Sequence, residues 1–298
     1  MPNNKSMHEH DNLILKPAVR DGLSDFDPAS EFGIEDSKRG HAILKENRKK
    51  IQDLTDMLNA SKKHGVLIVL QGMDASGKDS AMKHVFRRVR PQITRMTDFK
   101  EPTNLEKRQD FLRKAFLNLP NRGEIGIFNR SYYEEVVTTR VHPEYIVKQG
   151  LPGIGSADDM GEEFWDARFN SINNLEEYLS RNGFIILKFY MNLSHDKQKD
   201  RFLRRIRRPD KHWKFEYKDI QERGYWDEYM HYYEQAFQKT STFYAPWHVI
   251  PADKKWVSRA LISDILVSTL EKVSLRYPIA PEQKQVQMKE AKIQLKSQ

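Results

Sequence analysis

Residues 66–80 read Val-Leu-Ile-Val-Leu-Gln-Gly-Met-Asp-Ala-Ser-Gly-Lys-Asp-Ser, and this stretch decides the fold. The unbroken aliphatic run from Val66 to Leu70 is typical of a strand buried on both faces of a parallel sheet. Gly72 to Lys78 then matches G-x-x-x-x-G-K, between this strand and a helix predicted to begin near Gly77. The glycines let backbone N–H groups turn toward phosphate oxygens, and the helix N-terminus adds positive potential. The stretch therefore predicts a phosphate-binding loop.

The loop supplies most of the candidate site. Lys78 brings a full positive charge to the loop. Asp74 places a carboxylate in a loop that binds anions, which weakens binding unless a cation lies between them, so Asp74 is the leading Mg²⁺ ligand. Asp79 stands where a Ser or Thr would normally bind Mg²⁺. Its carboxylate has two open interpretations, a role in the site or complementing the helix dipole. The predicted phosphate and nucleotide ligands here are Gly72, Ala75, Ser76, Gly77, Lys78, Asp79 and Ser80.

A second buried strand, residues 125–128, ends in Asn129-Arg130. Ligands of such folds bind at the carboxyl ends of parallel strands, so both side chains are expected in the site. Asn129 is a candidate metal ligand, acting directly or through a metal-bound water, and Arg130 is expected to reach a phosphate. Glu134 and Lys100 are further candidate binding residues, although a lone lysine such as Lys100 also fits a solvated surface position.

Strands and helices alternate along the chain. Further strands are predicted at 184–190 and 247–250, and helices at 42–63, 104–117, 164–181, 196–208, 220–239 and 256–272. This alternation predicts an α/β fold, a P-loop kinase-like doubly wound parallel sheet flanked by helices. We expect an N-terminal extension over 1–40, one phosphotransferase domain over 41–275 and a polar tail over 276–298.

Positive charge is concentrated in one segment. Residues 197–214 contain nine basic and two acidic residues, a local charge of +7, while the whole chain has a net charge of +8. Such a segment attracts a polyanion.

Composition excludes other classes of protein. The mean hydropathy of -0.77 is polar, and no apolar run approaches the roughly 20 residues of a membrane span. The first twelve residues lack the apolar core of a secretory signal, and the chain has no cysteine, so we expect a cytoplasmic protein with no membrane partner.

These segments resemble the polyphosphate kinase family 2. The resemblance covers about residues 43–272 and rests on Gly-Met-Asp-Ala-Ser-Gly-Lys-Asp at 72–79, Gly-Glu-Ile-Gly-Ile-Phe-Asn-Arg-Ser at 123–131, Thr-Arg-Val-His-Pro-Glu at 139–144 and Trp-Lys-Phe at 213–215. The segments 133–134 and 141–143 are most similar to the branch that accepts both nucleoside mono- and diphosphates.

The resemblance implies reversible, Mg²⁺-dependent transfer of phosphoryl groups from inorganic polyphosphate to ADP, GDP and AMP, giving di- and triphosphates such as ATP, with Mn²⁺ as the alternative ion. It also implies that the basic segment forms a helical lid over about residues 197–222, which closes over the phosphates. It makes Lys78, Asp74 and Arg130 catalytic, together with the lid arginines Arg201, Arg205 and Arg208. Where other members carry aspartate at position 129 this chain has asparagine. Family members tend to assemble, so a homo-oligomer, dimer or tetramer, is expected.

Two rival functions fit part of the sequence. An ATP-dependent nucleotide or small-molecule kinase would use the same loop, because the loop alone does not identify the phosphate donor. A nucleic-acid-binding module would use the basic segment, with Trp213 and Phe215 stacking on bases, but it leaves Lys78 without a role. We therefore expect no nucleic-acid partner. No Asn-Lys-x-Asp motif supports a GTPase.

Overall fold

The computed structural model describes residues 10–15 and 22–298, and within them six strands form one sheet in the order β1-β6-β5-β2-β4-β3. Five strands run parallel, and β1 pairs antiparallel with β6. The strands are β1 (Ile14–Leu15), β2 (Gly65–Gln71), β3 (Thr94–Asp98), β4 (Ile125–Asn129), β5 (Phe184–Asn192) and β6 (Trp247–Pro251). The predicted doubly wound parallel sheet is confirmed.

The register of the central strands brings the candidate site together. Leu70 of β2 and Asp98 of β3 both lie opposite Asn129 of β4. Because these strands are parallel, their carboxyl ends meet at one edge of the sheet. The phosphate loop that follows β2 therefore lies beside the ends of β4 and β3.

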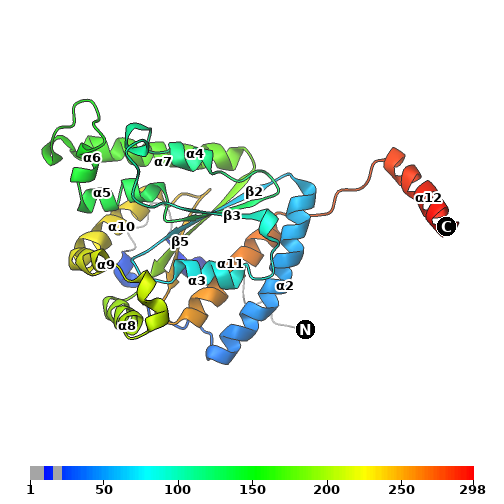
Figure 1. The fold of residues 1–298 in the computed structure, drawn as a ribbon, viewed down its shortest axis with the longest axis horizontal. Helices are drawn as coiled ribbons and strands as arrows, with labels where there is room; N and C mark the ends of the chain where they lie inside the picture. Colours follow the sequence, from blue (N-terminus) through cyan, green and yellow to red (C-terminus); the bar gives the residue numbers. More distant parts are fainter. Residues whose placement is uncertain (1–9, 16–21) are drawn as a thin grey trace.

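Helices cover both faces of the sheet (Figure 1). On one face α2 (Ser37–Ser61), α3 (Lys78–Val85) and α11 (Lys255–Lys272) bury their apolar side chains against β2 and β5. On the other face α7 (Glu162–Arg181) and α10 (Trp226–Thr240) do the same, with the short helices α4 (Arg113–Leu117), α5 (Thr138–Val141) and α6 (Glu144–Val147). Tyr229 and Tyr233 of α10 belong to this second core.

The basic segment folds as a series of short helices. These are α8 (His195–Ile206), η7 (Pro209–Lys214), α9 (Tyr217–Glu222) and η8 (Arg223–Tyr225). Pro209 begins η7, because proline cannot continue the α-helix that ends before it. Figure 1 shows α8 and α9 next to the end of the sheet that carries the phosphate loop.

The remaining elements are shorter or peripheral. The 3₁₀ helices are η1 (His10–Leu13), η2 (Leu23–Asp25), η3 (Pro91–Ile93), η4 (Glu106–Arg108), η5 (Tyr132–Glu135) and η6 (Ala157–Asp159). The tail forms α12 (Glu282–Lys296), which projects away from the domain and buries no side chain (Figure 1). No helix of the described residues is long and apolar enough to cross a membrane.

Three features differ from the predicted elements. The helix predicted at 104–117 is wrong, because only η4 and α4 are helical there. The helix predicted at 220–239 is interrupted by η8 between α9 and α10. Two strands were not predicted: β1, which has only two residues, and the edge strand β3, whose sequence Thr-Arg-Met-Thr-Asp contains no apolar run. The domain boundaries at residues 41 and 275 stay a prediction.

Candidate active site

The phosphate loop needs both of its glycines. Gly72 has a φ of +138°, and a Cβ atom there would lie 2.9 Å from the Met191 carbonyl oxygen. Gly77 has a φ of +102° and stands immediately before α3, which begins at Lys78. Residues other than glycine rarely adopt these positive φ angles, so glycine is required for the loop to turn back toward the helix N-terminus.

Lys78 is held over the loop. Its side chain is only 7% exposed, and Nζ donates to the carbonyl oxygens of Gly72 at 2.6 Å and Met73 at 3.3 Å. Burial and the neighbouring Arg130 lower the pKa of Lys78, although Asp74 opposes them. The ammonium group therefore lies against the backbone of the phosphate loop, shielded from water.

Asp74 and Arg130 form the shortest ion pair at the centre of the site. Arg130 Nη2 lies 2.5 Å from Asp74 Oδ1, and Arg130 Nη1 lies 3.7 Å from Glu134 Oε2. Burial alone would raise the pKa of Asp74, but Arg130 and Lys78 outweigh it and hold that pKa below its usual value. The negative charges of Glu134 and Asp74 raise the pKa of Arg130, although burial opposes them. Asp74 stays ionised, and Arg130 is its partner.

Asn129 joins two carboxylates that belong to different elements, α3 and β3. Its Nδ2 donates to Asp79 Oδ1 at 2.7 Å and to Asp98 Oδ1 at 2.8 Å. The other side-chain atom, Oδ1, is buried and has no hydrogen-bond partner. Asp79 therefore makes a specific contact in the site. Asp98, which was not predicted, joins the set because β3 ends beside β4.

Arg201 differs from its predicted role as a lid arginine that contacts phosphate. It is 7% exposed, and its Nη1 donates to the carbonyl oxygens of Ala75 and Ser76, each at 2.8 Å. Nη2 donates to Ala252 at 2.5 Å and Asp253 at 3.1 Å. Burial lowers the pKa of Arg201 to about 10, so the guanidinium remains charged at neutral pH. The guanidinium of Arg201 is thus hydrogen-bonded to four carbonyl groups, and it joins the phosphate loop to the segment after β6.

The other two predicted lid arginines pair with aspartates of the lid. Arg205 Nη1 donates to Asp219 Oδ2 at 2.9 Å, and Arg208 donates to both carboxylate oxygens of Asp210. Burial and the charge of Asp74 raise the pKa of Asp219 to about 6 in spite of Arg205.

One cleft of about 1120 Å³ brings these groups together. Every residue predicted for the site lines it, including Ser80 and Lys100. Further lining residues that were not predicted include Asp98, Arg204, Asp219, Glu222 and Lys255. Lys255 is the first residue of α11 and comes shortly after β6 ends at Pro251, so its place after a strand was the available signal.

A glycine loop between a central parallel strand and a helix, with a buried lysine and an opposing basic lid, defines a P-loop kinase. A family model for polyphosphate kinase 2 matches residues 35–278. The chain belongs to the polyphosphate kinase 2 family.

Three similar proteins cover most of the chain. It is 42% identical over 244 residues to the ADP-polyphosphate phosphotransferase of Rhodopseudomonas palustris, covering 82% of this chain and 83% of that protein. It is 39% identical over 266 residues to the AMP/ADP-polyphosphate phosphotransferase of Meiothermus ruber, covering 89% of this chain and 94% of that protein. The crystal structure of polyphosphate kinase 2 from Arthrobacter aurescens superposes with a TM-score of 0.83 at 34% identity, covering 95% of this chain and 96% of that one.

Proposed function

We propose that this protein transfers phosphoryl groups reversibly between inorganic polyphosphate and nucleotides, with ADP, GDP and AMP as acceptors. The observation that carries the proposal is the single cleft in which the phosphate loop faces Arg204, Arg205, Arg208 and Lys211 of the lid. A run of cations opposite the loop suits a polyanion longer than one triphosphate. The relatives from R. palustris and M. ruber carry names of this kind of transferase.

The residues of the cleft suggest how the reaction is assisted. Backbone N–H groups of the loop and Lys78 would hold the transferred phosphoryl group, and Arg130 would leave Asp74 in part to reach the same oxygens. The acceptor phosphate is already an anion at neutral pH, so the protein needs no general base. The protein's contribution is then alignment and charge neutralisation.

Kinases of this kind typically use a divalent metal ion, and the side chains here fit Mg²⁺. Asn129 Oδ1 is a buried acceptor without a partner, and the carboxylates of Asp79 and Asp98 are within hydrogen-bond distance of the same amide. Mg²⁺ is usually held by one or two carboxylates plus substrate phosphates. Asn129 and these carboxylates would therefore hold it, with Asp74 as the predicted further ligand, and the ion would neutralise charge on the phosphates.

The test incubates the purified protein with long-chain polyphosphate, Mg²⁺ and either ADP or AMP, and follows ATP with luciferase. Lys78→Ala is the matched negative control, with circular dichroism to show that it folds. ATP formation that is lost in Lys78→Ala supports the proposal, and the AMP reaction, followed as ADP and ATP by chromatography, decides the acceptor range. A folded protein that makes no ATP from polyphosphate, but phosphorylates another acceptor from ATP, would be an ordinary kinase.

We also propose that the protein acts as a homo-oligomer in the cytoplasm. The tendency of its family to assemble supports the first part, and the absence of cysteine supports the second. Light scattering during size-exclusion chromatography measures the mass of the assembly, and a monomer at working concentration would contradict it.

A further inference from the structure

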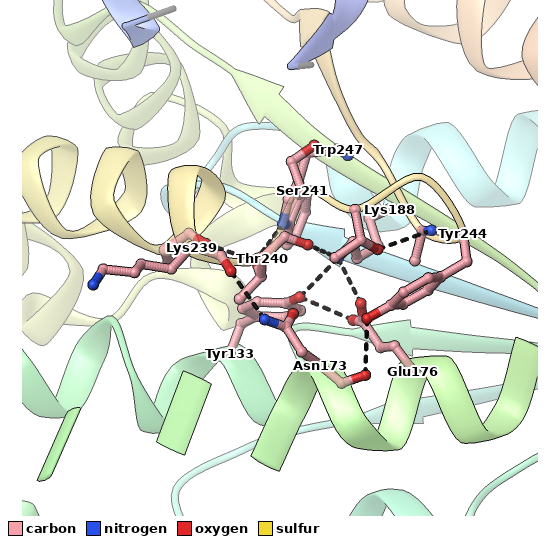
Figure 2. Close-up of polar contacts among 12 residues, drawn as sticks. Tyr133, Asn173, Glu176, Lys188, Lys239, Thr240, Ser241, Tyr244 and Trp247 are labelled. Carbon is pink, nitrogen blue, oxygen red and sulfur yellow. Dashed lines mark hydrogen bonds and ion pairs between the residues drawn. The ribbon is translucent and has the colours of Figure 1, made fainter. Parts of the chain in front are cut away.

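A buried ion pair lies beneath the active site and has no place in the reaction described above. Lys188 in the middle of β5 and Glu176 of α7 are both 0% exposed, and their Nζ and Oε2 atoms lie 2.6 Å apart (Figure 2). Taking two charges out of water costs several kcal/mol for each ion, about as much as their attraction returns. The pair therefore calls for an explanation other than stability.

The pair is fully hydrogen-bonded, and its partners point to the active site. Lys188 Nζ also donates to Tyr133 Oη at 2.9 Å and to the Thr240 carbonyl at 2.7 Å, which uses all three ammonium donors. Tyr132 Oη and Tyr133 Oη each donate to Glu176 Oε1 at 2.9 Å. Burial and Glu176 raise the pKa of both tyrosines well above the usual value, so both stay neutral donors.

These tyrosines lie in the sequence between two residues that line the cleft, Arg130 and Glu134. Arg130 has a φ of +58°, a left-handed backbone conformation that is strained for a residue with a Cβ atom. Two residues further on, η5 begins at Tyr132 and includes Glu134. The turn from Arg130 to Glu134 is thus attached to β4 at one end and to the buried pair through the tyrosine hydroxyl groups.

The same pair fixes a second wall of the cleft. Thr240, whose carbonyl accepts from Lys188, is the last residue of α10, and α10 carries Tyr229 and Tyr233 into the cleft. Figure 2 shows Lys188 between Thr240, Glu176 and Tyr133, so one ammonium group joins α10, α7 and η5.

We propose that the Lys188–Glu176 pair positions the Arg130–Glu134 turn, and that it sets Arg130 at the phosphate-binding edge of the cleft. Apolar side chains could fill the same volume, but they would leave the tyrosine rings free to slide, whereas directional hydrogen bonds to a buried charge fix both hydroxyl groups. Lys188 and Glu176 are positioning residues, because they act through Tyr132 and Tyr133.

The test replaces the pair by apolar residues, Lys188→Met with Glu176→Leu. Both tyrosine hydroxyl groups and the Thr240 carbonyl lose a hydrogen-bond partner in this variant, so we expect a lower melting temperature. Activity and exchange are therefore compared at temperatures at which the variant is folded. We also expect kcat to fall at least about tenfold with a smaller change in KM, because a displacement of about 1 Å can cost up to about 100-fold in rate. Amide hydrogen exchange of residues 129–137 should become faster.

A second variant keeps the fold and restores the acceptor. Lys188→Met with Glu176→Gln retains a carbonyl oxygen where both tyrosines donate, and most of the lost kcat should return. The matched control is the exposed pair Lys239–Asp166, which also joins α10 to α7 at 2.9 Å. Replacing Lys239→Gln with Asp166→Asn should leave both kcat and the exchange of residues 129–137 unchanged.

The activity measurement rests on the proposed function, but hydrogen exchange does not. If the unmodified protein transfers no phosphate from polyphosphate, the proposed function fails, and exchange of residues 129–137 still decides the positioning role. Unchanged exchange and unchanged kcat in the Met/Leu variant would overturn the inference. A lower melting temperature with both readouts unchanged would also overturn it, because the pair would then serve stability alone.

Discussion

Replacing Arg201 by lysine tests whether the phosphate loop is held in place from the lid side. The guanidinium donates to two carbonyls of the loop and two of the segment after β6. A lysine has a single nitrogen, which cannot reach both pairs, so about two of these bonds should be lost. Each hydrogen bond to a charged group is worth about 1.5–3 kcal/mol, so the loss is at least about 3 kcal/mol. If this lost free energy comes from poorer alignment of the phosphate loop in the transition state, kcat/KM decreases by about 100-fold.

The assay measures initial rates of ATP formation from polyphosphate and ADP, with the melting temperature of each variant. Arg207→Lys is the control, because Arg207 is an exposed residue at the end of the same helix. A value of kcat/KM for Arg201→Lys within about twofold of the unmodified protein, at temperatures where it is folded, would refute the argument. Loop alignment would then not depend on these four bonds.

Three further predictions concern pH, metal and backbone. The pKa of Asp219 is raised to about 6 in the folded protein, whereas in the unfolded chain its carboxyl group loses its proton near pH 4. The free energy of unfolding contributed by this residue therefore decreases as the pH rises through about 6. The melting temperature of Asp219→Asn, minus that of the unmodified protein, should therefore increase from about pH 5 to about pH 7. A difference that does not change with pH would contradict this. Asn129→Asp places a third carboxylate at a position where Asn129 now donates to two carboxylates, so its melting temperature in EDTA should be lower than that of the unmodified protein. Addition of Mg²⁺ should raise the melting temperature of this variant by more than it raises that of the unmodified protein. An equal rise in both proteins would count against the metal assignment. Gly72→Ala should abolish phosphate transfer and lower the melting temperature, because its Cβ would lie 2.9 Å from a backbone oxygen; an active, stable variant would be inconsistent with the loop geometry.

Sequence patterns were sufficient to predict a strand where all of its residues are buried. The strand predicted at 66–70 is β2, and its central place explains why all seven of its residues are buried and apolar side chains dominate it. The strand predicted at 184–190 is β5, but nothing local indicates that Lys188 within it is buried. Its partner Glu176 lies on a helix twelve residues earlier, and only the packing of α7 on the sheet brings the two together.

The site was predictable where it follows a buried strand and less so where it depends on distant contacts. The loop and Asn129 follow β2 and β4, and both line the cleft as expected. Asp98 was missed because the polar edge strand before it has no apolar signal. Among the lid arginines, helical spacing could not separate Arg201 from Arg205, because the distinction depends on carbonyl groups of residues 75, 76, 252 and 253.

The antiparallel strand β1 has a practical consequence for fragment design. Its two residues cover the outer edge of β6, with Ile14 opposite His248 and Leu15 opposite Trp247, and Leu15 is buried. An expression fragment cut at residue 41 would remove this cover and open the outer edge of β6, while its other edge stays paired with β5. Open edges of this kind recruit strands from other molecules. A shortened protein would therefore tend to precipitate, and affinity tags are better joined ahead of the complete N-terminal segment than in place of it.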